Sequence, residues 1–212
     1  MDELHPEMFV VEAATGKMYR NGFDQHGRPV AYMRPRLENT KDWDNQVRHL
    51  VYTMERLVDS MDPAAGVESW VWIFDFHGMS YSTSVPISIG RQIVDILGTS
   101  YPERLGVAYM VDAPYIFSFF WAAISPLLHP VTKSKVKFCS STRSGAKADP
   151  AFLENFKDPS SLEADFGGSL ESQYDHRVYW DNERAFLAAR SQENSPTAAA
   201  AANADAPDTP TN

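Results

Sequence analysis

The sequence predicts an α/β fold in which strands alternate with helices and form a mainly parallel sheet. Two short runs, residues 70–76 and 107–111, are almost wholly apolar and rich in β-branched and aromatic residues, which is typical of strands covered on both faces. The segments that precede and follow them have helical patterns. Because alternating strands and helices connect through right-handed crossovers, most of the strands are expected to run parallel.

In chain order, the first predicted elements are a turn-rich stretch over residues 16–28 and a short strand over residues 29–33. A helix is predicted over residues 44–61, because apolar side chains recur there at spacings of three and four. These side chains form one buried face: Val47, Leu50, Val51, Met54, Leu57, Val58 and Met61.

Two further helices and one strand follow. Residues 87–97 are expected to form a helix that Gly98 ends in a left-handed cap. An apolar helix is predicted over residues 115–127, and a fourth strand over residues 136–139. Residues 191–212 contain no aromatic or large aliphatic side chain, so this tail cannot offset the entropy of ordering and is expected to be disordered.

Composition restricts the classes of function. The chain has 212 residues, 43% of them hydrophobic, which is enough for one domain with a sizeable core. The formal charge of -9 argues against nucleic acid as a partner. Cys139 is the single cysteine, and the N-terminus lacks the features of a secretory signal, so a cytoplasmic protein is expected. The apolar region over residues 105–128 is interrupted by polar residues and prolines and is not expected to span a membrane.

One enzymatic interpretation remains open at this stage. Asp75 and Asp112 lie near the carboxyl ends of two predicted parallel strands, where α/β enzymes place catalytic carboxylates, so a hydrolase-like enzyme is an alternative. Helix capping or a loop hydrogen bond is the simpler role for both. The six histidines have none of the spacings of a zinc site, and no metal site is expected.

Three motifs resemble the core of the CRAL-TRIO lipid-binding domain. They are a Tyr-Pro-Glu-Arg turn, the apolar segment that begins Ala-Pro-Tyr, and a Pro-Val-Thr turn with a lysine three residues after the threonine, at residues 101–104, 113–117 and 130–135. Similar segments at residues 27–30, 75–78 and 162–168 extend the resemblance over residues 16–182. Within the family, the chain is similar to yeast-type phosphatidylinositol transfer proteins, in the fungal branch linked to azole tolerance and sterol handling.

The resemblance implies a sheet and helices that enclose an apolar lipid cavity closed by a movable gate helix. It implies that Glu103, Thr132 and Lys135 bind the lipid head group. Trp70 and Trp72 stand where phosphatidylcholine-binding members have short hydroxyl side chains, so phosphatidylinositol or a sterol is expected instead of a choline lipid. The gate residues that the resemblance implies are Phe117, Phe119, Phe120, Trp121, Ile124, Leu127 and Leu128.

The same resemblance implies a soluble lipid-transfer protein with no catalysis and no cofactor besides the lipid. Transient, peripheral association with membranes is expected, and a basic patch that favours anionic bilayers would comprise Lys133, Lys137, Arg143 and Lys147. A solvated basic edge is the alternative for this patch. The sequence carries no signal for an oligomeric state.

The family usually has a helical lobe before this domain, and here about fifteen residues precede Gly16. We therefore divide the chain into an N-terminal remnant (1–15), the lipid-binding domain (16–182), a C-terminal helical extension (183–190) and the disordered tail (191–212). The missing lobe suggests a truncated product or fragment. A lipid-sensing or protein-interaction module that does not transfer lipid is the second functional hypothesis.

Overall fold

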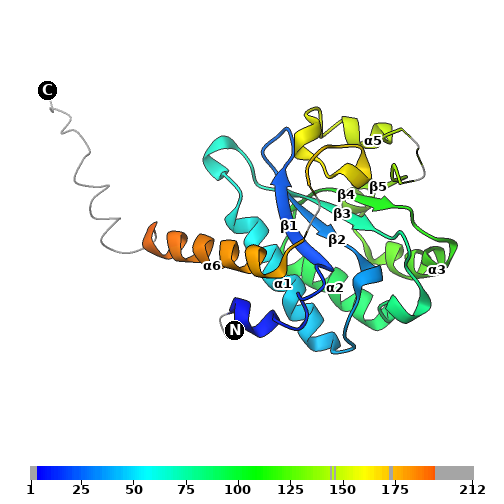
Figure 1. The fold of residues 1–212 in the computed structure, drawn as a ribbon. Helices are drawn as coiled ribbons and strands as arrows, with labels where there is room; N and C mark the ends of the chain where they lie inside the picture. Colours follow the sequence, from blue (N-terminus) through cyan, green and yellow to red (C-terminus); the bar gives the residue numbers. More distant parts are fainter. Residues whose placement is uncertain (1–3, 144, 146, 172–173, 194–212) are drawn as a thin grey trace, which may run out of the picture. The chain divides into compact units, whose positions relative to one another are not determined.

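The sheet has five strands within the part of the chain that the computed structural model describes, which is residues 4–143, 145, 147–171 and 174–193. The strands are β1 (Met18–Phe23), β2 (Pro29–Met33), β3 (Trp70–Asp75), β4 (Leu105–Val111) and β5 (Val136–Cys139), and they lie side by side in that order (Figure 1). β1 is antiparallel to β2, whereas β2 to β5 are all parallel. The predicted α/β fold with a mainly parallel sheet is confirmed.

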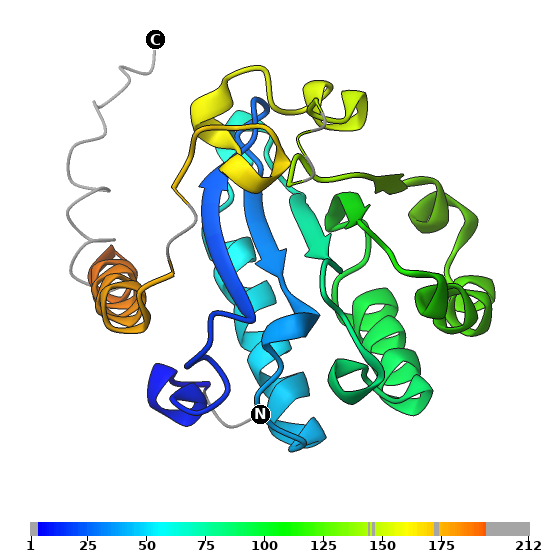
Figure 2. The same cartoon turned by 45° about the vertical axis from the view of Figure 1, so that its right-hand side comes forward.

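Helices connect the parallel strands. α1 (Trp43–Asp59) joins β2 to β3 and α2 (Ile87–Ser100) joins β3 to β4. The last crossover contains α3 (Tyr115–Ile124), a 3-10 turn and α4 (Pro130–Ser134). Since consecutive strands are also neighbours in the sheet, crossovers of one hand place these helices on one face. Figure 2 shows α1 behind the strands, whereas the yellow segment that includes α5 (Pro150–Leu153) lies in front of them.

Alternate residues of the strands form two different cores. On the helical face, Trp70 and Trp72 of β3 belong to one apolar cluster with Leu57 of α1 and Phe117 of α3. On the opposite face, aromatic pairs join the sheet to the segment after β5, since Tyr109 stacks on Phe152 with 4.5 Å between ring centroids and Tyr32 stacks on Phe166 at 5.9 Å. The sheet therefore separates two differently built sides.

Two element predictions differ from the structure. The turn-rich stretch before Pro29 contains β1, an edge strand whose register is interrupted between Arg20 and Phe23, where Gly22 has a φ of 71°. Its mixed polar sequence has no strand periodicity. In α2, Gly98 does not end the helix, which continues to Ser100. The half-buried Leu97 packs against the core and keeps this last turn helical at the modest cost of a helical glycine.

Residues 4–15 contain a buried aromatic side chain. A 3-10 turn (Pro6–Phe9) places the Phe9 side chain in full burial, with its ring 5.3 Å from His49 and 5.2 Å from Tyr52 of α1. Residues 4–15, which we set apart as a remnant, thus pack against α1.

A separate compact unit begins at Asp175 and contains α6 (His176–Glu193). The predicted extension over residues 183–190 is helical, but its helix begins earlier, at His176. Residues 191–193 of the predicted disordered tail are helical, and the rest of that tail lies outside the described residues. Within the described ranges, no helix has both the length and the hydrophobicity needed to cross a membrane.

Candidate functional site

A cavity of about 780 Å³ lies between the helical face of the sheet and helices α1 to α4. Most of its walls are apolar side chains from both layers, among them Met33, Phe74 and Met110 of the sheet and Ile93 of α2. The segment of residues 79–87, which leads into α2, contributes further lining residues. A cavity of this size and composition is suited to a large apolar ligand.

Helix α3 forms one wall of this cavity. Of the predicted gate residues, those that line it are Phe117, Phe120, Trp121, Ile124, Leu127 and Leu128. Phe117 is buried, with its ring 4.4 Å from that of Phe76. Phe119 does not line the cavity: it is 65% exposed and makes an edge contact with Tyr115, which is 83% exposed. The consecutive aromatic residues of α3 thus divide between the cavity and the solvent.

The two tryptophans of β3 have different positions. Trp72 lines the cavity, whereas Trp70 does not and is fully buried. The ring of Trp70 makes edge contacts with Trp72 at 6.5 Å and with Tyr101 at 5.8 Å. Trp70 therefore supports the cavity wall from behind, and Trp72 occupies space within it.

One end of the cavity is polar, and it contains the three predicted head-group residues. Glu103 precedes β4, while Thr132 and Lys135 belong to the turn of helix before β5, so all three lie near the amino ends of neighbouring parallel strands. The ammonium of Lys135 is 3.1 Å from the Glu103 carboxylate. The Thr132 hydroxyl has no hydrogen-bond partner among the described residues.

Glu103 is held in an unusual conformation. Its φ is 59°, in the left-handed region, within a tight turn in which the Arg104 N–H donates to the Tyr101 carbonyl at 3.3 Å. A non-glycine residue in this region costs about 1 kcal/mol or more, and such strain occurs often at ligand sites. The turn directs Glu103 to the cavity rim, where its side chain is 75% exposed.

Ionisable residues also line the opposite end, but there they are both paired and deeply buried, or neutral. Lys17 binds the carboxylates of Glu12 and Glu38, the latter at 2.7 Å. Burial, reinforced by the nearby Lys17 charge, lowers the pKa of His49 to about 3, so this imidazole is neutral. The polar end at Glu103 is therefore the better place for a charged group of a ligand.

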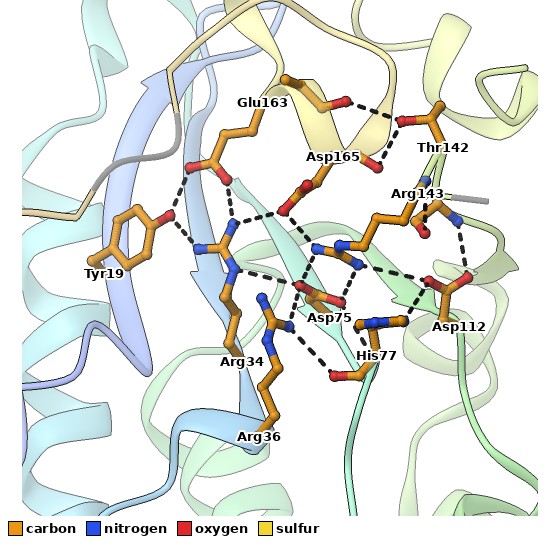
Figure 3. Close-up of polar contacts among 12 residues, drawn as sticks. Tyr19, Arg34, Arg36, Asp75, His77, Asp112, Thr142, Arg143, Glu163 and Asp165 are labelled. Carbon is orange, nitrogen blue, oxygen red and sulfur yellow. Dashed lines mark hydrogen bonds and ion pairs between the residues drawn. The ribbon is translucent and has the colours of Figure 1, made fainter. Parts of the chain in front are cut away.

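A cluster of charged residues gathers around the carboxyl ends of β2 and β3 (Figure 3). Arg143 donates to both oxygens of Asp75, at 2.9 and 2.6 Å, and to Asp165 at 2.6 Å. Arg34 binds Glu163 and lies 3.4 Å from Asp75. Burial alone would raise the pKa of Asp75, but hydrogen bonds from Arg143 and Arg36 outweigh it and lower that pKa.

This cluster corrects two sequence-based interpretations. Both oxygens of Asp75 are bound by arginines, so its carboxylate joins elements instead of facing a substrate pocket. Arg143 does not belong to a basic membrane patch, because its side chain is 19% exposed and its guanidinium binds Asp75 and Asp165. Asp112 accepts a hydrogen bond from the Ser141 N–H at 2.9 Å, the loop role that we had considered for it.

The three lysines of the predicted patch are placed as follows. Lys133 and Lys147 are exposed. Lys137 is half-buried and binds the Glu154 carboxylate on the side of the sheet that carries α5. No local signal in the sequence marks the charged cluster, because its members come from the segment after β2, from β3 and from two later loops.

An apolar cavity with one polar end, enclosed by a mainly parallel sheet and its helices, defines a lipid-binding type of domain. The chain belongs to the CRAL/TRIO domain family, whose model matches residues 13–168.

Several known proteins are similar to the chain. It is 34% identical to the CRAL-TRIO domain-containing protein C23B6.04c of Schizosaccharomyces pombe, over 85% of this chain and 17% of that protein. It is 35% identical to the phosphatidylinositol transfer protein PDR17 of Saccharomyces cerevisiae, over 84% of this chain and 49% of that protein. Identity to the SEC14 cytosolic factor of Candida glabrata is 27%, over 81% of this chain and 59% of that protein. The chain thus spans less than two thirds of each of these relatives.

Among solved structures, the crystal structure of Sfh5 shares the fold, with a TM-score of 0.52 and 20% sequence identity over 65% of this chain and 50% of that one.

Proposed function

We propose that the chain binds one phosphatidylinositol molecule, with its acyl chains in the apolar cavity and its head group at Glu103, Thr132 and Lys135, and exchanges it at membranes. The observation that carries this proposal is the cavity itself, which is apolar along its walls and polar at that end. Burying a methylene is worth about 0.8 kcal/mol, so removing two long acyl chains from a bilayer requires on the order of 20 kcal/mol of replacement burial. A deep apolar cavity supplies such burial.

The polar end suits a phosphodiester that carries inositol. Lys135 donates charge-assisted hydrogen bonds, which are stronger than neutral ones, and Thr132 has a hydroxyl available for the phosphate. Glu103 orients Lys135 and can accept from inositol hydroxyls. Trp72 reduces the space within the cavity, which disfavours a choline lipid and leaves a sterol as a second compact cargo.

Further parts of the proposal concern chemistry and location. The chain needs no cofactor and catalyses no reaction, in agreement with the arginine-bound state of Asp75. It acts in the cytoplasm and associates transiently with membranes. The exposed Tyr115 and Phe119 of α3 would contact the bilayer, with Lys133 and Lys147 as basic residues near an anionic surface.

Lipid extraction tests the proposal. The purified chain is extracted with organic solvent, and the extract is identified by mass spectrometry. We expect about one phosphatidylinositol per chain, or a sterol for the second cargo. A folded protein that yields no lipid, even after incubation with vesicles that contain phosphatidylinositol, would contradict lipid binding.

A second function is a lipid-sensing or protein-interaction module that does not transfer lipid. It is favoured by the comparison with C23B6.04c, since the chain corresponds to only 17% of that protein. Transfer between donor and acceptor vesicles separates the two functions: binding with no transfer above the protein-free rate identifies the module.

A further inference from the structure

Helix α4 directs three polar side chains into one end of the cavity. His129 is its N-cap, Thr132 lies within it, and Lys135 is its C-cap. All three line the cavity, whereas the residues between them are exposed and do not. A spacing of three residues places these side chains on one face of a helical turn.

The hydrogen bonding of His129 leaves one ring nitrogen for a ligand. The Val131 N–H donates to Nδ1 of His129 at 3.3 Å. Because Nδ1 acts as the acceptor, a neutral imidazole carries its hydrogen on Nε2. Nε2 has no hydrogen-bond partner within the part of the chain that the structure describes, so this N–H can donate to a bound molecule.

Donors outnumber free acceptors at this end of the cavity. His129 Nε2, the Thr132 hydroxyl and the Lys135 ammonium can all donate. Among the described residues, Glu103 supplies the one carboxylate that lines this end, and it is 3.1 Å from the Lys135 ammonium. A ligand group with several anionic oxygens therefore meets donors and no unpaired negative charge.

We propose that His129 is a head-group-binding residue and that, with Thr132 and Lys135, it selects glycerophospholipids whose head group carries a phosphomonoester. A phosphomonoester has three terminal oxygens and a charge of about -1.5 to -2 at neutral pH, whereas a phosphodiester has two such oxygens and a single charge. Three donors on one helical face match the monoester. The inference rests on the proposed binding of lipid in this cavity and goes beyond it by naming the selected chemistry.

Competitive loading tests the inference. The full chain is incubated with phosphatidylcholine vesicles that contain equal amounts of phosphatidylinositol, phosphatidylinositol 4-phosphate and phosphatidic acid. After re-isolation, the bound lipids are quantified by mass spectrometry. We expect at least one of the two monoester lipids to be enriched over phosphatidylinositol by about tenfold, the effect of one added hydrogen bond to a charged group. The two separate lipids distinguish a phosphate on inositol from a phosphate on glycerol.

Variants of His129 isolate its contribution. His129→Asp keeps a side chain that caps the helix but replaces the Nε2 donor with a carboxylate, so the monoester-to-phosphatidylinositol ratio should fall about tenfold. His129→Asn keeps a neutral cap and should give an intermediate ratio. Lys137→Ala is the control: it removes one positive charge outside the cavity, where Lys137 binds Glu154, and should leave the ratio unchanged.

Two results would overturn the inference and leave the proposed function intact. They are phosphatidylinositol loading without enrichment of either monoester lipid, and an unchanged ratio in both His129 variants with thermal unfolding like that of the unaltered chain. An absence of every lipid from the unaltered chain would instead contradict lipid binding itself.

Discussion

Lys135 is the cationic residue at the polar end of the cavity, with its side chain 24% exposed and its ammonium beside Glu103. Replacing it with alanine should weaken phosphatidylinositol binding about tenfold to a hundredfold, because a hydrogen bond to a charged group contributes about 1.5–3 kcal/mol. Titration of the chain with vesicles that contain phosphatidylinositol measures the change.

Lys137→Ala is the control for Lys135→Ala, because Lys137 binds Glu154 and does not line the cavity. It should bind phosphatidylinositol like the unaltered chain. If the cavity also takes a sterol, Lys135→Ala should retain it. An equal loss of phosphatidylinositol and sterol in Lys135→Ala would contradict a head-group role for this lysine.

His49 links the stability of the domain to pH. Burial, with a further contribution from Lys17, lowers its pKa from 6.5 to about 3, so the unfolded chain binds a proton more readily than the folded one. Its contribution to stability is complete above pH 6.5 and is lost as the pH falls towards 3. Within that window, the free energy of unfolding should fall by about 1.4 kcal/mol per pH unit through this residue.

Urea unfolding at pH 7.5, 6 and 5 measures this dependence. His49→Phe keeps an aromatic ring beside Phe9 and cannot titrate, so its free energy of unfolding should change less over the same range. Asp75 does not interfere, because its lowered pKa confines its contribution to lower pH: that contribution is full above 3.8 and is lost as the pH falls through its folded value. Identical pH profiles for the two proteins would contradict the assignment to His49.

How much of the site could be predicted depends on whether its residues carry a local signal. Glu103, Thr132 and Lys135 belong to short motifs, and the structure brings them to one end of the cavity. The charged cluster has no such signal, because Arg34 and Glu163 are far apart in the sequence and meet only in the folded chain. Arg143 therefore resembled a surface residue in the sequence.

At the scale of elements, the contact between α2 and α3 depends on one glycine. A Cβ on Gly90 would lie 2.6 Å from Phe120 and 3.2 Å from Ile124, whereas a Cβ on Gly98 would meet nothing within 4 Å. Alanine is favoured over glycine in a helix by about 1 kcal/mol. Gly98→Ala should therefore stabilise the domain by about that amount.

Gly90→Ala should lack this gain, because the added methyl displaces Phe120 and with it the cavity wall formed by α3. Chemical unfolding compares the two variants, and lipid transfer between vesicles reports the effect on α3. We expect Gly98→Ala to transfer lipid normally and Gly90→Ala to transfer it at a changed rate. An equal stability gain in both variants with unchanged transfer would show that α3 does not depend on this close approach.

The elements themselves were predictable where periodicity was strong. The apolar face of α1 and the buried runs of β3 and β4 determine their positions, and the alternation of strands with helices predicts the mainly parallel sheet. β1 was missed because its mixed polar sequence has no apolar alternation, although its Met18 and Tyr19 are buried. The predicted helix end at Gly98 was wrong because a left-handed cap depends on tertiary packing. The packing of Leu97 against the core keeps residues 98–100 helical.

At the scale of the whole molecule, the two faces of the sheet are built differently. The helical face holds the cavity, whose empty volume makes this side less stable than a filled core would be. The other face holds the aromatic stacks, and the charged cluster at the carboxyl ends of β2 and β3 links these strands to the segment after β5. The sheet is therefore joined to the segment after β5 through both aromatic and ionic contacts.

Deletion of the first fifteen residues tests where the domain begins. The structure buries Phe9 against α1, and Glu12, 1% exposed, binds Lys17 and accepts from the Thr40 hydroxyl at 2.8 Å. Deleting residues 1–15 should lower the free energy of unfolding by at least about 3 kcal/mol, since loss of one buried Phe side chain costs about 3–5 kcal/mol. Urea unfolding measures the loss.

Two single substitutions show whether the loss in the free energy of unfolding comes from this packing or from shortening the chain. Phe9→Ala should account for most of the loss, because its ring contacts both His49 and Tyr52. Val11→Ala, at a side chain that is 65% exposed, should change the free energy of unfolding by less than about 0.5 kcal/mol. If the deletion were as mild as Val11→Ala, residues 1–15 would be the dispensable remnant that the sequence suggested. A large loss instead makes this segment part of the lipid-binding domain, since its Phe9 packs against the side of α1 that carries His49.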